Sequence, residues 1–300
     1  MPGKSTRKAY ALAILAVLCW STSPTAFKLG LRYQDSYQLL TGASLTSMVV
    51  LGMIILFRGH KGSHIKFKWR DLGFSALMGL LNPVAYYLIL FKAYAILPAQ
   101  VAQPLNMIWP IVLVVISIPL LRQKISWKSI GAMFLSFTGV VLVSFQGGTV
   151  DKDPENRIGV FLALSTSLIW AFYFILNSKE RKDSVLRLFL NFVFASSYLL
   201  IGGIFKGEVL PESPQGWSAA IYVGIFEMGI TFVLWIRAMQ LAPSTDKISN
   251  MVFIAPFLNL IIVNQVLDER IFLTTVYGIV LLVSGVMMQN MLGRHAKISR

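Results

Sequence analysis

The feature that most constrains this chain is a series of long apolar runs, separated by short segments that hold most of the charged residues. Only 13% of the residues are charged and the mean hydropathy is +0.67, whereas a soluble domain carries about 25% charged residues. A helix of about 20 apolar residues is long enough to cross the hydrocarbon core of a bilayer. The sequence therefore predicts an all-α integral membrane protein, and it lacks the alternating segments typical of membrane β-barrels.

Each apolar run is interpreted as one membrane span. The first run follows three basic residues, as a signal peptide would, but it has no suitable small-residue cleavage site and continues past Pro24, so we interpret it as a span. The predicted spans are residues 9–30, 36–57, 72–95, 99–121, 127–145, 158–178, 185–205, 217–240, 246–267 and 271–292.

The basic residues are distributed unevenly between the two sets of connecting loops. With the N-terminus in the cytoplasm, most of the 27 Lys and Arg residues fall on the cytoplasmic side. An excess of basic residues marks cytoplasmic loops, so both termini are expected in the cytoplasm. The net charge of +14 is then explained by topology and by attraction to anionic lipid headgroups, and no nucleic-acid partner is expected. The basic residues expected outside are Arg32, Lys152, Arg157, Lys206 and Arg270.

The two halves of the chain share a pattern at a spacing of about 145 residues. The segment KAYAILP, from Lys92, corresponds to RAMQLAP, from Arg237, and Trp20 corresponds to Trp170. A match at a fixed period indicates structural duplication. Each half holds five predicted spans, an odd number, so the halves are expected to enter the membrane in opposite senses. The predicted division is a first repeat at 1–146, an external linker at 147–157 and a second repeat at 158–300.

Inverted repeats are the architecture of secondary transporters, whose substrate site lies near the middle of the membrane where the halves meet. We therefore expect ten transmembrane helices, arranged as two inverted five-helix repeats around a central cavity. No nucleotide-binding loop of the G-x-x-x-x-G-K-[ST] type occurs, and neither an enzymatic activity nor a cofactor is expected. The single cysteine, Cys19, and three scattered histidines predict no disulfide and no metal site.

Several motifs resemble those of a known family. A Trp lies in the first and sixth spans, Ala-x-x-x-x-Pro ends the third and eighth, a Pro lies in the fourth and ninth, and Leu-Asp-Glu-Arg-Ile precedes a Gly-Val tenth span. Because these motifs occur together in this order, the chain resembles the EamA-type members of the drug/metabolite transporter superfamily over nearly its whole length. The resemblance implies a cavity lined mainly by spans 1, 3, 4, 6, 8 and 9, and transport of small metabolites, often export, without ATP. The chain departs from the family at Gln123, where an acid is usual; the second half keeps the acid as Glu269.

Glu227 is the most informative single residue, because it lies inside the eighth predicted span. A carboxylate there costs several kcal/mol unless it faces a cavity, is paired or is protonated. Regular helical spacing places Thr231 and Trp235 on its face. The repeat relates Glu227 to Asn82, which shares a face with Tyr86. We interpret Glu227 as a counter-ion for a substrate or as a proton-coupling carboxylate; the alternative is a hydrogen bond between helices.

Other polar and aromatic residues lie in the spans expected to line the cavity. Trp20 and Trp170 occupy matching positions, and Pro104 and Pro110 are expected to bend the fourth span, as at many transporter sites. For these residues the alternatives are aromatic packing and hydrogen bonds between helices. The candidate substrate-binding residues are Glu227, Trp20, Trp170, Asn82, Tyr86, Gln103, Asn106, Tyr173, Asn177, Thr231 and Asn250.

Three basic residues lie near predicted span ends, namely Lys28, Lys92 and Arg237. Long basic side chains at such positions reach the membrane interface. A role in gating or in binding a carboxylate is the alternative.

The expected function is therefore a secondary transporter, and by resemblance an exporter, of a small metabolite such as an amino acid or related amine. The expected location is a bacterial inner membrane. Aromatic faces beside a carboxylate also suit choline-like quaternary amines. A non-transporting membrane receptor is the alternative from another class. The sequence leaves open the coupling ion, including proton coupling at Glu227, and the oligomeric state.

Overall fold

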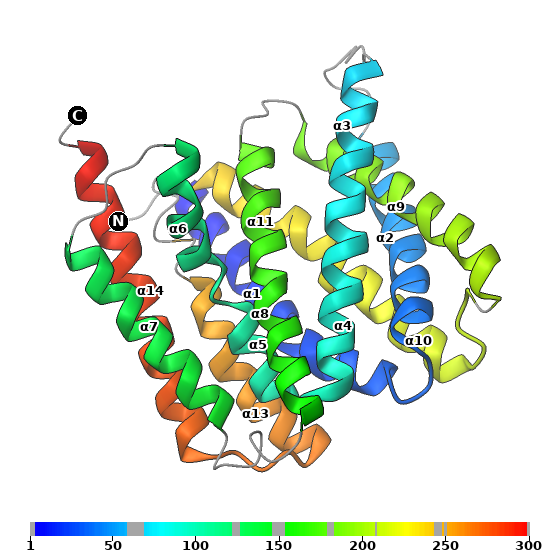
Figure 1. Ribbon diagram of the computed structural model, residues 1–300. Helices are drawn as coiled ribbons and strands as arrows, with labels where there is room; N and C mark the ends of the chain where they lie inside the picture. Colours follow the sequence, from blue (N-terminus) through cyan, green and yellow to red (C-terminus); the bar gives the residue numbers. More distant parts are fainter. Residues whose placement is uncertain are drawn as a thin grey trace. The chain divides into compact units, whose positions relative to one another are not determined.

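The computed structural model describes residues 4–58, 69–121, 127–145, 154–178, 183–207, 209–242, 248 and 251–298. Within these residues all regular secondary structure is helical, from α1 (Lys4–Gly30) to α14 (Leu273–Ile298) (Figure 1). This confirms the predicted all-α class. Six described helices are long and apolar enough to cross a membrane: Thr6–Gly30, Ser36–Phe57, Trp69–Ile96, Pro154–Asn177, Ser184–Lys206 and Pro214–Leu241. Three shorter helices are also apolar, at Ile130–Val143, Met251–Leu267 and Leu273–Gln289.

The helices form two compact units, and each unit combines segments from both halves of the chain. Unit 1 consists of Met1–Phe91 and Lys179–Ala255, and unit 2 consists of Lys92–Ser178 and Pro256–Arg300. The units are defined by contacts in space, whereas the predicted repeats are defined by similar sequence, so the two divisions need not coincide. The predicted repeat boundaries therefore stay a prediction.

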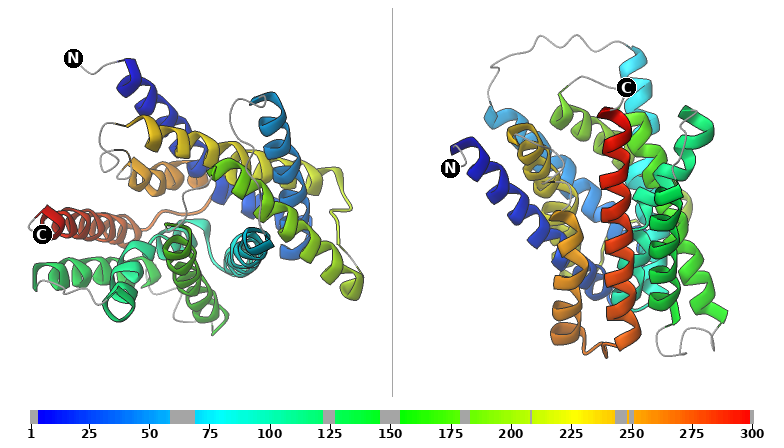
Figure 2. Two further views of the ribbon diagram at one scale, coloured as in Figure 1. Left: turned by 90° about the horizontal axis from the view of Figure 1, so that it is seen from above. Right: turned by 90° about the vertical axis from the view of Figure 1, so that its left-hand side faces the viewer.

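In unit 1, the first span lies against the end of the eighth. Helix α1 packs along α11 (Ile230–Leu241) (Figure 2). Helix α2 (Ser36–Arg58) packs against α9 (Ser184–Lys206) and against the π-helix η4 (Val223–Gly229). The other elements are α3 (Trp69–Gly79), η1 (Leu80–Ala85), α4 (Tyr86–Ile96, whose last residues belong to unit 2), α10 (Pro214–Tyr222) and η5 (Met251–Ile254).

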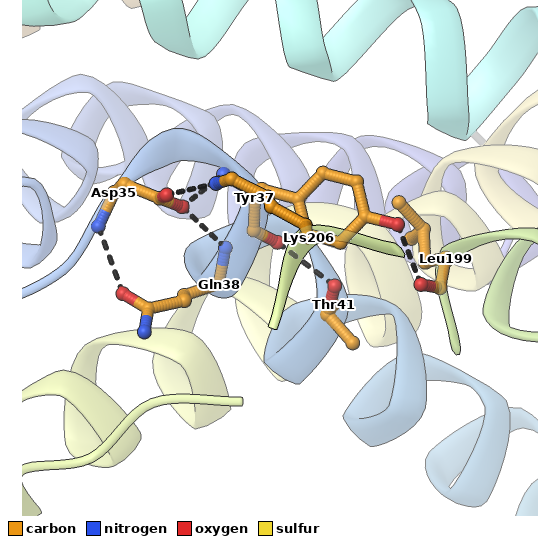
Figure 3. A network of polar contacts seen from close by, with 6 residues as sticks. All are labelled: Asp35, Tyr37, Gln38, Thr41, Leu199 and Lys206. Carbon is orange, nitrogen blue, oxygen red and sulfur yellow. Dashed lines mark hydrogen bonds and ion pairs between the residues drawn. The ribbon is translucent and has the colours of Figure 1, made fainter. Parts of the chain in front are cut away.

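A polar network around Asp35 fixes the start of α2 to the end of α9 (Figure 3). Its Oδ1 accepts hydrogen bonds from the backbone of Tyr37 (2.7 Å) and Gln38 (2.8 Å), as a helix N-cap does. Its Oδ2 pairs with Lys206, and the Tyr37 hydroxyl donates to the Leu199 carbonyl at 2.6 Å. Burial raises the pKa of Asp35, but the hydrogen bonds and the Lys206 charge outweigh burial and leave that pKa below its usual value. Asp35 is therefore ionised at neutral pH.

Two long apolar spans of unit 1 contain a π-helical segment, η1 in the third predicted span and η4 in the eighth. In η1, Asn82 has non-helical angles (φ −146°, ψ 113°), because a residue that precedes a proline, here Pro83, is disfavoured in the α conformation. No proline occurs in η4, and the break follows at Gly229 (φ −99°, ψ −92°). Both spans therefore depart from regular α-helical spacing where Asn82 and Glu227 lie.

In unit 2, the predicted fourth span at 99–121 is two helices and not one. Helix α5 (Ala99–Asn106) ends with Met107 as its C-cap residue, and α6 (Trp109–Leu121) begins two residues after this cap. Pro110, in the first turn of α6, has no N–H to donate, so it suits the start of a helix but not its interior. The other elements of unit 2 are α7 (Trp127–Phe145), α8 (Pro154–Ser178), α13 (Ala255–Leu267, whose first residue belongs to unit 1) and α14.

Helices α7 and α14 lie side by side in unit 2 (Figure 1). The Ser136 hydroxyl donates to the Leu282 carbonyl at 3.0 Å. A Cβ atom added at Gly139 would lie 2.5 Å from the carbonyl oxygen of Gly278. Small residues of this kind let membrane helices approach closely, so Gly139 sets the distance between the two backbones.

The connection between α13 and α14 is hydrogen-bonded to the start of α5. The Glu269 carboxylate accepts from the backbone N–H groups of Ala99 (2.9 Å) and Gln100 (3.3 Å). In return, the Gln100 side chain donates to the Arg270 carbonyl at 2.9 Å. The first N–H groups of a helix have no partner within it, and Glu269 supplies one. The corresponding Gln123 lies outside the described residues.

The Gly139→Ala variant should be less stable than the wild type by about 1–3 kcal/mol, because the added methyl group meets backbone atoms that cannot turn away. The measurement is thermal unfolding of the detergent-purified protein. Gly131→Ala, on the same helix, is the matched control, since a Cβ there has nothing within 4 Å. Equal stabilities for the two variants would contradict the close packing of α7 and α14.

The Glu269→Ala variant should lose about 1–2 kcal/mol of stability, because two N–H groups at the start of α5 lose their acceptor. Thermal unfolding measures this loss as well. Arg270→Ala is the control, because it keeps the backbone carbonyl that Gln100 uses. The interpretation is wrong if both variants unfold at the same temperature.

Candidate functional site

Glu227 lies in η4 and is held by hydroxyl groups from two other segments of unit 1. The Tyr87 hydroxyl, on the second residue of α4, donates to Glu227 Oε1 at 2.8 Å. The Ser23 hydroxyl of α1 is the second side-chain hydrogen-bond partner of the carboxyl group. A carboxylate in an apolar span needs partners of this kind. The structure therefore brings the first, third and eighth predicted spans together at one acid.

The π-helical turn of η4 aligns two polar residues toward α1. In a π-helix the backbone hydrogen bond joins residues five apart, and Tyr222 lies five residues before Glu227. The Tyr222 hydroxyl is 2.7 Å from Thr22 Oγ1, while Glu227 meets the neighbouring Ser23. Both contacts therefore join α1 to the eighth predicted span, one from the last residue of α10 and one from η4.

Trp20 lies one turn before these hydroxyl groups on α1 and packs against aromatic rings of α11. Its ring centroid is 5.1 Å from that of Trp235 and 5.8 Å from that of Phe232, both in edge-on arrangements. All three side chains are partly buried. Edge-to-face contacts of this kind add to the energy of area burial. Unit 1 therefore holds an aromatic group and a carboxylate on α1 and the eighth span.

The predicted common face of Glu227, Thr231 and Trp235 assumed regular helical spacing, which the break at Gly229 interrupts. Thr231 is fully buried and its hydroxyl donates to the Phe226 carbonyl. In the third span, Asn82 is buried within η1. Tyr86 is buried with its ring 4.8 Å from the Tyr87 ring. The tyrosine hydroxyl that bonds to Glu227 is that of Tyr87, next to the predicted Tyr86.

Unit 2 contains a second group of candidate residues on α5 and α8. The Asn106 amide donates to the Thr166 hydroxyl at 2.7 Å. Gln103, three residues earlier on α5, is 5% exposed, and its Oε1 has no hydrogen-bond partner. A buried acceptor without a partner carries an energetic penalty, which a hydrogen-bond donor on a ligand would remove.

Aromatic rings continue this group along α8. The Trp170 centroid is 6.4 Å from that of Trp109 on α6 and 5.6 Å from that of Tyr173. Trp170 lies one helical turn after Thr166, so the polar and aromatic parts follow each other on one helix face. Asn177 does not join them through any contact that we identify, and its side chain is exposed.

The three basic candidates differ in their exposure. Lys28 is half-buried near the end of α1, and Lys92 is exposed on α4. Arg237 is exposed and its nearest hydrogen-bond partner is Gln240, at 3.4 Å. Exposure suits side chains that reach an interface, and the gating role is not tested. Asn250 lies outside the described residues.

Sequence reasoning missed two hydroxyl residues that the structure brings to candidate residues, Ser23 and Thr166, and the contact between Thr22 and Tyr222. It also selected Tyr86 instead of its neighbour Tyr87. Ser and Thr in an apolar helix usually donate to their own backbone, and Ser23 and Thr22 both donate to the Cys19 carbonyl. A second partner on another helix leaves no signal in the sequence. In the described part of the chain, no three His, Cys, Asp or Glu residues group as metal ligands would.

Comparison with known proteins shows to which family this sequence is similar. The model of the EamA-like transporter family matches residues 7–145 and again residues 157–291. An uncharacterized transporter of Archaeoglobus fulgidus is 23% identical over 283 residues, 93% of this chain and 96% of that protein. The uncharacterized transporter YvbV of Bacillus subtilis is 24% identical, over 95% of this chain and 92% of its own.

Two further similarities concern a named exporter and a solved structure. The aromatic amino acid exporter YddG of Ancylobacter novellus is 24% identical over 240 residues, 79% of this chain and 81% of that protein. A protein of known crystal structure superimposes with a TM-score of 0.64 at 20% identity, over 97% of this chain and 99% of its own, which shows a shared fold. Because the family model covers most of the sequence in two segments, this chain is a membrane protein that belongs to the EamA-like transporter family.

Proposed function

We propose that this protein is a secondary transporter that exports a small metabolite, such as an amino acid or related amine, by alternating access. The observation that carries the proposal is the Glu227 carboxyl group within an apolar span, hydrogen-bonded to Tyr87 and Ser23. An ionisable residue inside a membrane span marks a substrate or ion pathway by default. Its aromatic neighbours on α1 and α11 would contact the apolar part of a bound amine.

The substrate class follows from the chemistry of both groups of residues. A carboxylate in a medium with little water favours an ammonium group, and aromatic rings attract cations and pack against apolar side chains. The unpartnered Gln103 oxygen in unit 2 calls for an N–H or O–H donor. An aromatic amino acid has an ammonium group and a ring. The similarity to an exporter of aromatic amino acids supports this class and the outward direction.

The proposed architecture is two inverted five-helix repeats around a central cavity, in a bacterial inner membrane with both termini in the cytoplasm. Two separate matches to one family model, at 7–145 and 157–291, support the duplication. Opposite insertion of two similar halves provides the inward-open and outward-open states that transport requires. Transport needs no enzymatic step and no cofactor, and Glu227 would exchange a proton if transport is proton-coupled.

A carrier of choline-like quaternary amines is the second candidate, and the aromatic contacts of Trp20 favour it. The two classes differ in hydrogen bonding, since a quaternary ammonium group has no N–H to donate to Glu227 or Gln103. A membrane receptor that binds the same ligand without moving it is the alternative outside transport.

Ligand-induced thermal stabilisation of the purified protein tests the role of Glu227. L-tryptophan, L-phenylalanine and choline are compared with glucose and succinate, for the wild type and for Glu227→Gln. A ligand at a hundred times its dissociation constant should add about 2.7 kcal/mol of stability. We expect an amino acid or choline to stabilise the wild type, and the variant to lose the effect because its side chain carries no charge.

Glu212→Gln is the matched control, because Glu212 is exposed and precedes the apolar span. Stabilisation that survives in Glu227→Gln would mean that Glu227 only joins helices. Uptake of the stabilising compound into proteoliposomes then separates a transporter from a receptor. A protein that binds the compound but moves none of it under any gradient is not a transporter.

A further inference from the structure

Ser23 lies between two hydrogen-bond acceptors that belong to different helices. Its Oγ is 3.1 Å from the carbonyl oxygen of Cys19, one turn earlier on α1. The same hydroxyl is a hydrogen-bond partner of the Glu227 carboxyl group on η4. A serine hydroxyl has one hydrogen to donate and two lone pairs that accept. Ser23 can therefore donate to Cys19 or to Glu227 at any moment, but not to both.

The charge of Glu227 decides which of these bonds can form. An ionised carboxylate only accepts, so both of its hydroxyl neighbours, Tyr87 and Ser23, must donate to it. A neutral carboxyl group carries its own hydrogen and can donate it to Ser23. Ser23 is then free to donate to the Cys19 carbonyl, while Tyr87 continues to donate to Glu227.

The Cys19 carbonyl tolerates this exchange because a second hydroxyl serves it. Thr22 Oγ1 lies 2.7 Å from the same carbonyl oxygen. When Ser23 turns away, the carbonyl keeps one partner and no buried acceptor is left unsatisfied, which would otherwise cost free energy. The exchange is therefore a rotation of one hydroxyl group without a change in the backbone of α1.

We infer that Ser23 is a positioning residue whose hydroxyl alternates between Glu227 and the Cys19 carbonyl, and so links the charge state of the carboxyl group to α1. The inference rests on the proposed function, in which Glu227 is the group that gains and loses a positive partner. A proton at Glu227 would release Ser23 to α1, whereas a substrate ammonium group leaves the carboxylate ionised and Ser23 donating to it. This gives the first span a local signal that Glu227 is protonated.

The helices that pack around Glu227 carry several titratable side chains besides its hydroxyl partners. Helices α1, α2, α10 and α11 pack against η4. Among the described residues, Tyr87 is the titratable side chain that is hydrogen-bonded to Glu227. The other titratable residues of these helices and of α4 are Lys4, Arg7, Lys8, Tyr10, Cys19 and Lys28 on α1, Tyr37 and Arg58 on α2, Tyr222 on α10, Arg237 on α11, and Tyr86, Lys92 and Tyr94 on α4.

The test is an infrared titration of the full-length protein without ligand. A protonated carboxyl group has a carbonyl stretching band. The part of this band that is present in the wild type and absent in Glu227→Gln is assigned to Glu227. In Ser23→Ala the ionised carboxylate loses one of two donors. The midpoint of the titration should therefore move to higher pH than in the wild type, by about one unit or a tenfold change in proton affinity.

Ser21→Ala is the matched control. Ser21 is buried on the same helix, and its hydroxyl donates to the Val17 carbonyl at 2.7 Å, four residues back, as that of Ser23 does to Cys19. Its midpoint should equal that of the wild type. Ser23→Thr keeps the hydroxyl group and should restore the wild-type midpoint, which separates loss of the hydroxyl group from a general disturbance of α1. A Ser23→Ala midpoint equal to that of Ser21→Ala, or moved to lower pH, would overturn the inference.

This titration is independent of any substrate, so its failure is distinguishable from failure of the proposed function. If Glu227→Gln loses ligand stabilisation while Ser23→Ala titrates as the wild type, the proposed function stands and the role of Ser23 is rejected. If Ser23→Ala shifts the midpoint but Glu227→Gln still binds ligand, the hydroxyl exchange exists, but it does not serve a substrate site, and the inference fails in its functional part.

Discussion

The scarcity of water in a hydrocarbon core is the constraint on which the rest of this structure depends. Every polar group within a span must find its partner in the protein. Serine and threonine side chains meet this demand locally, by donating to carbonyl groups three or four residues back, as Ser21, Thr41 and Thr46 do. Where a polar group cannot be satisfied within its own helix, another helix must supply the partner. Glu227 is such a group, and three segments of unit 1 meet at it.

The same constraint explains why the candidate residues lie near irregular backbone. Both π-helical segments and the interruption between α5 and α6 leave backbone groups outside the regular α-helical pattern. Such interruptions are stable in a membrane only where the protein or a water-lined cavity covers them. Glu227 lies within η4, Tyr87 lies two residues after η1, and Asn106 is the last residue of α5. Irregular backbone and candidate side chains therefore occur together, as irregular backbone and substrate sites do in many transporters.

Each unit combines a polar part with aromatic rings, but the two groups differ in charge. In unit 1 the polar part is a carboxyl group, with Trp20 on the neighbouring helix. In unit 2 it is the neutral pair Asn106 and Thr166, next to an unpartnered Gln103 oxygen, with Trp170 one turn away. The matching tryptophans of the two halves thus have different neighbours.

The sequence by itself determined the helical class, the presence of membrane spans and the family, because hydropathy and motif spacing are properties of the chain alone. It also identified Glu227, since a carboxylate in an apolar run is visible without coordinates. Only the tertiary structure decided that Tyr87 and Ser23 hold Glu227, that Trp20 packs on Trp235, and that Thr231 turns to its own backbone. Helical periodicity tells which residues share a face, but not which helices pair. In η4, which has no proline, even the face depends on a π-turn that local sequence does not specify.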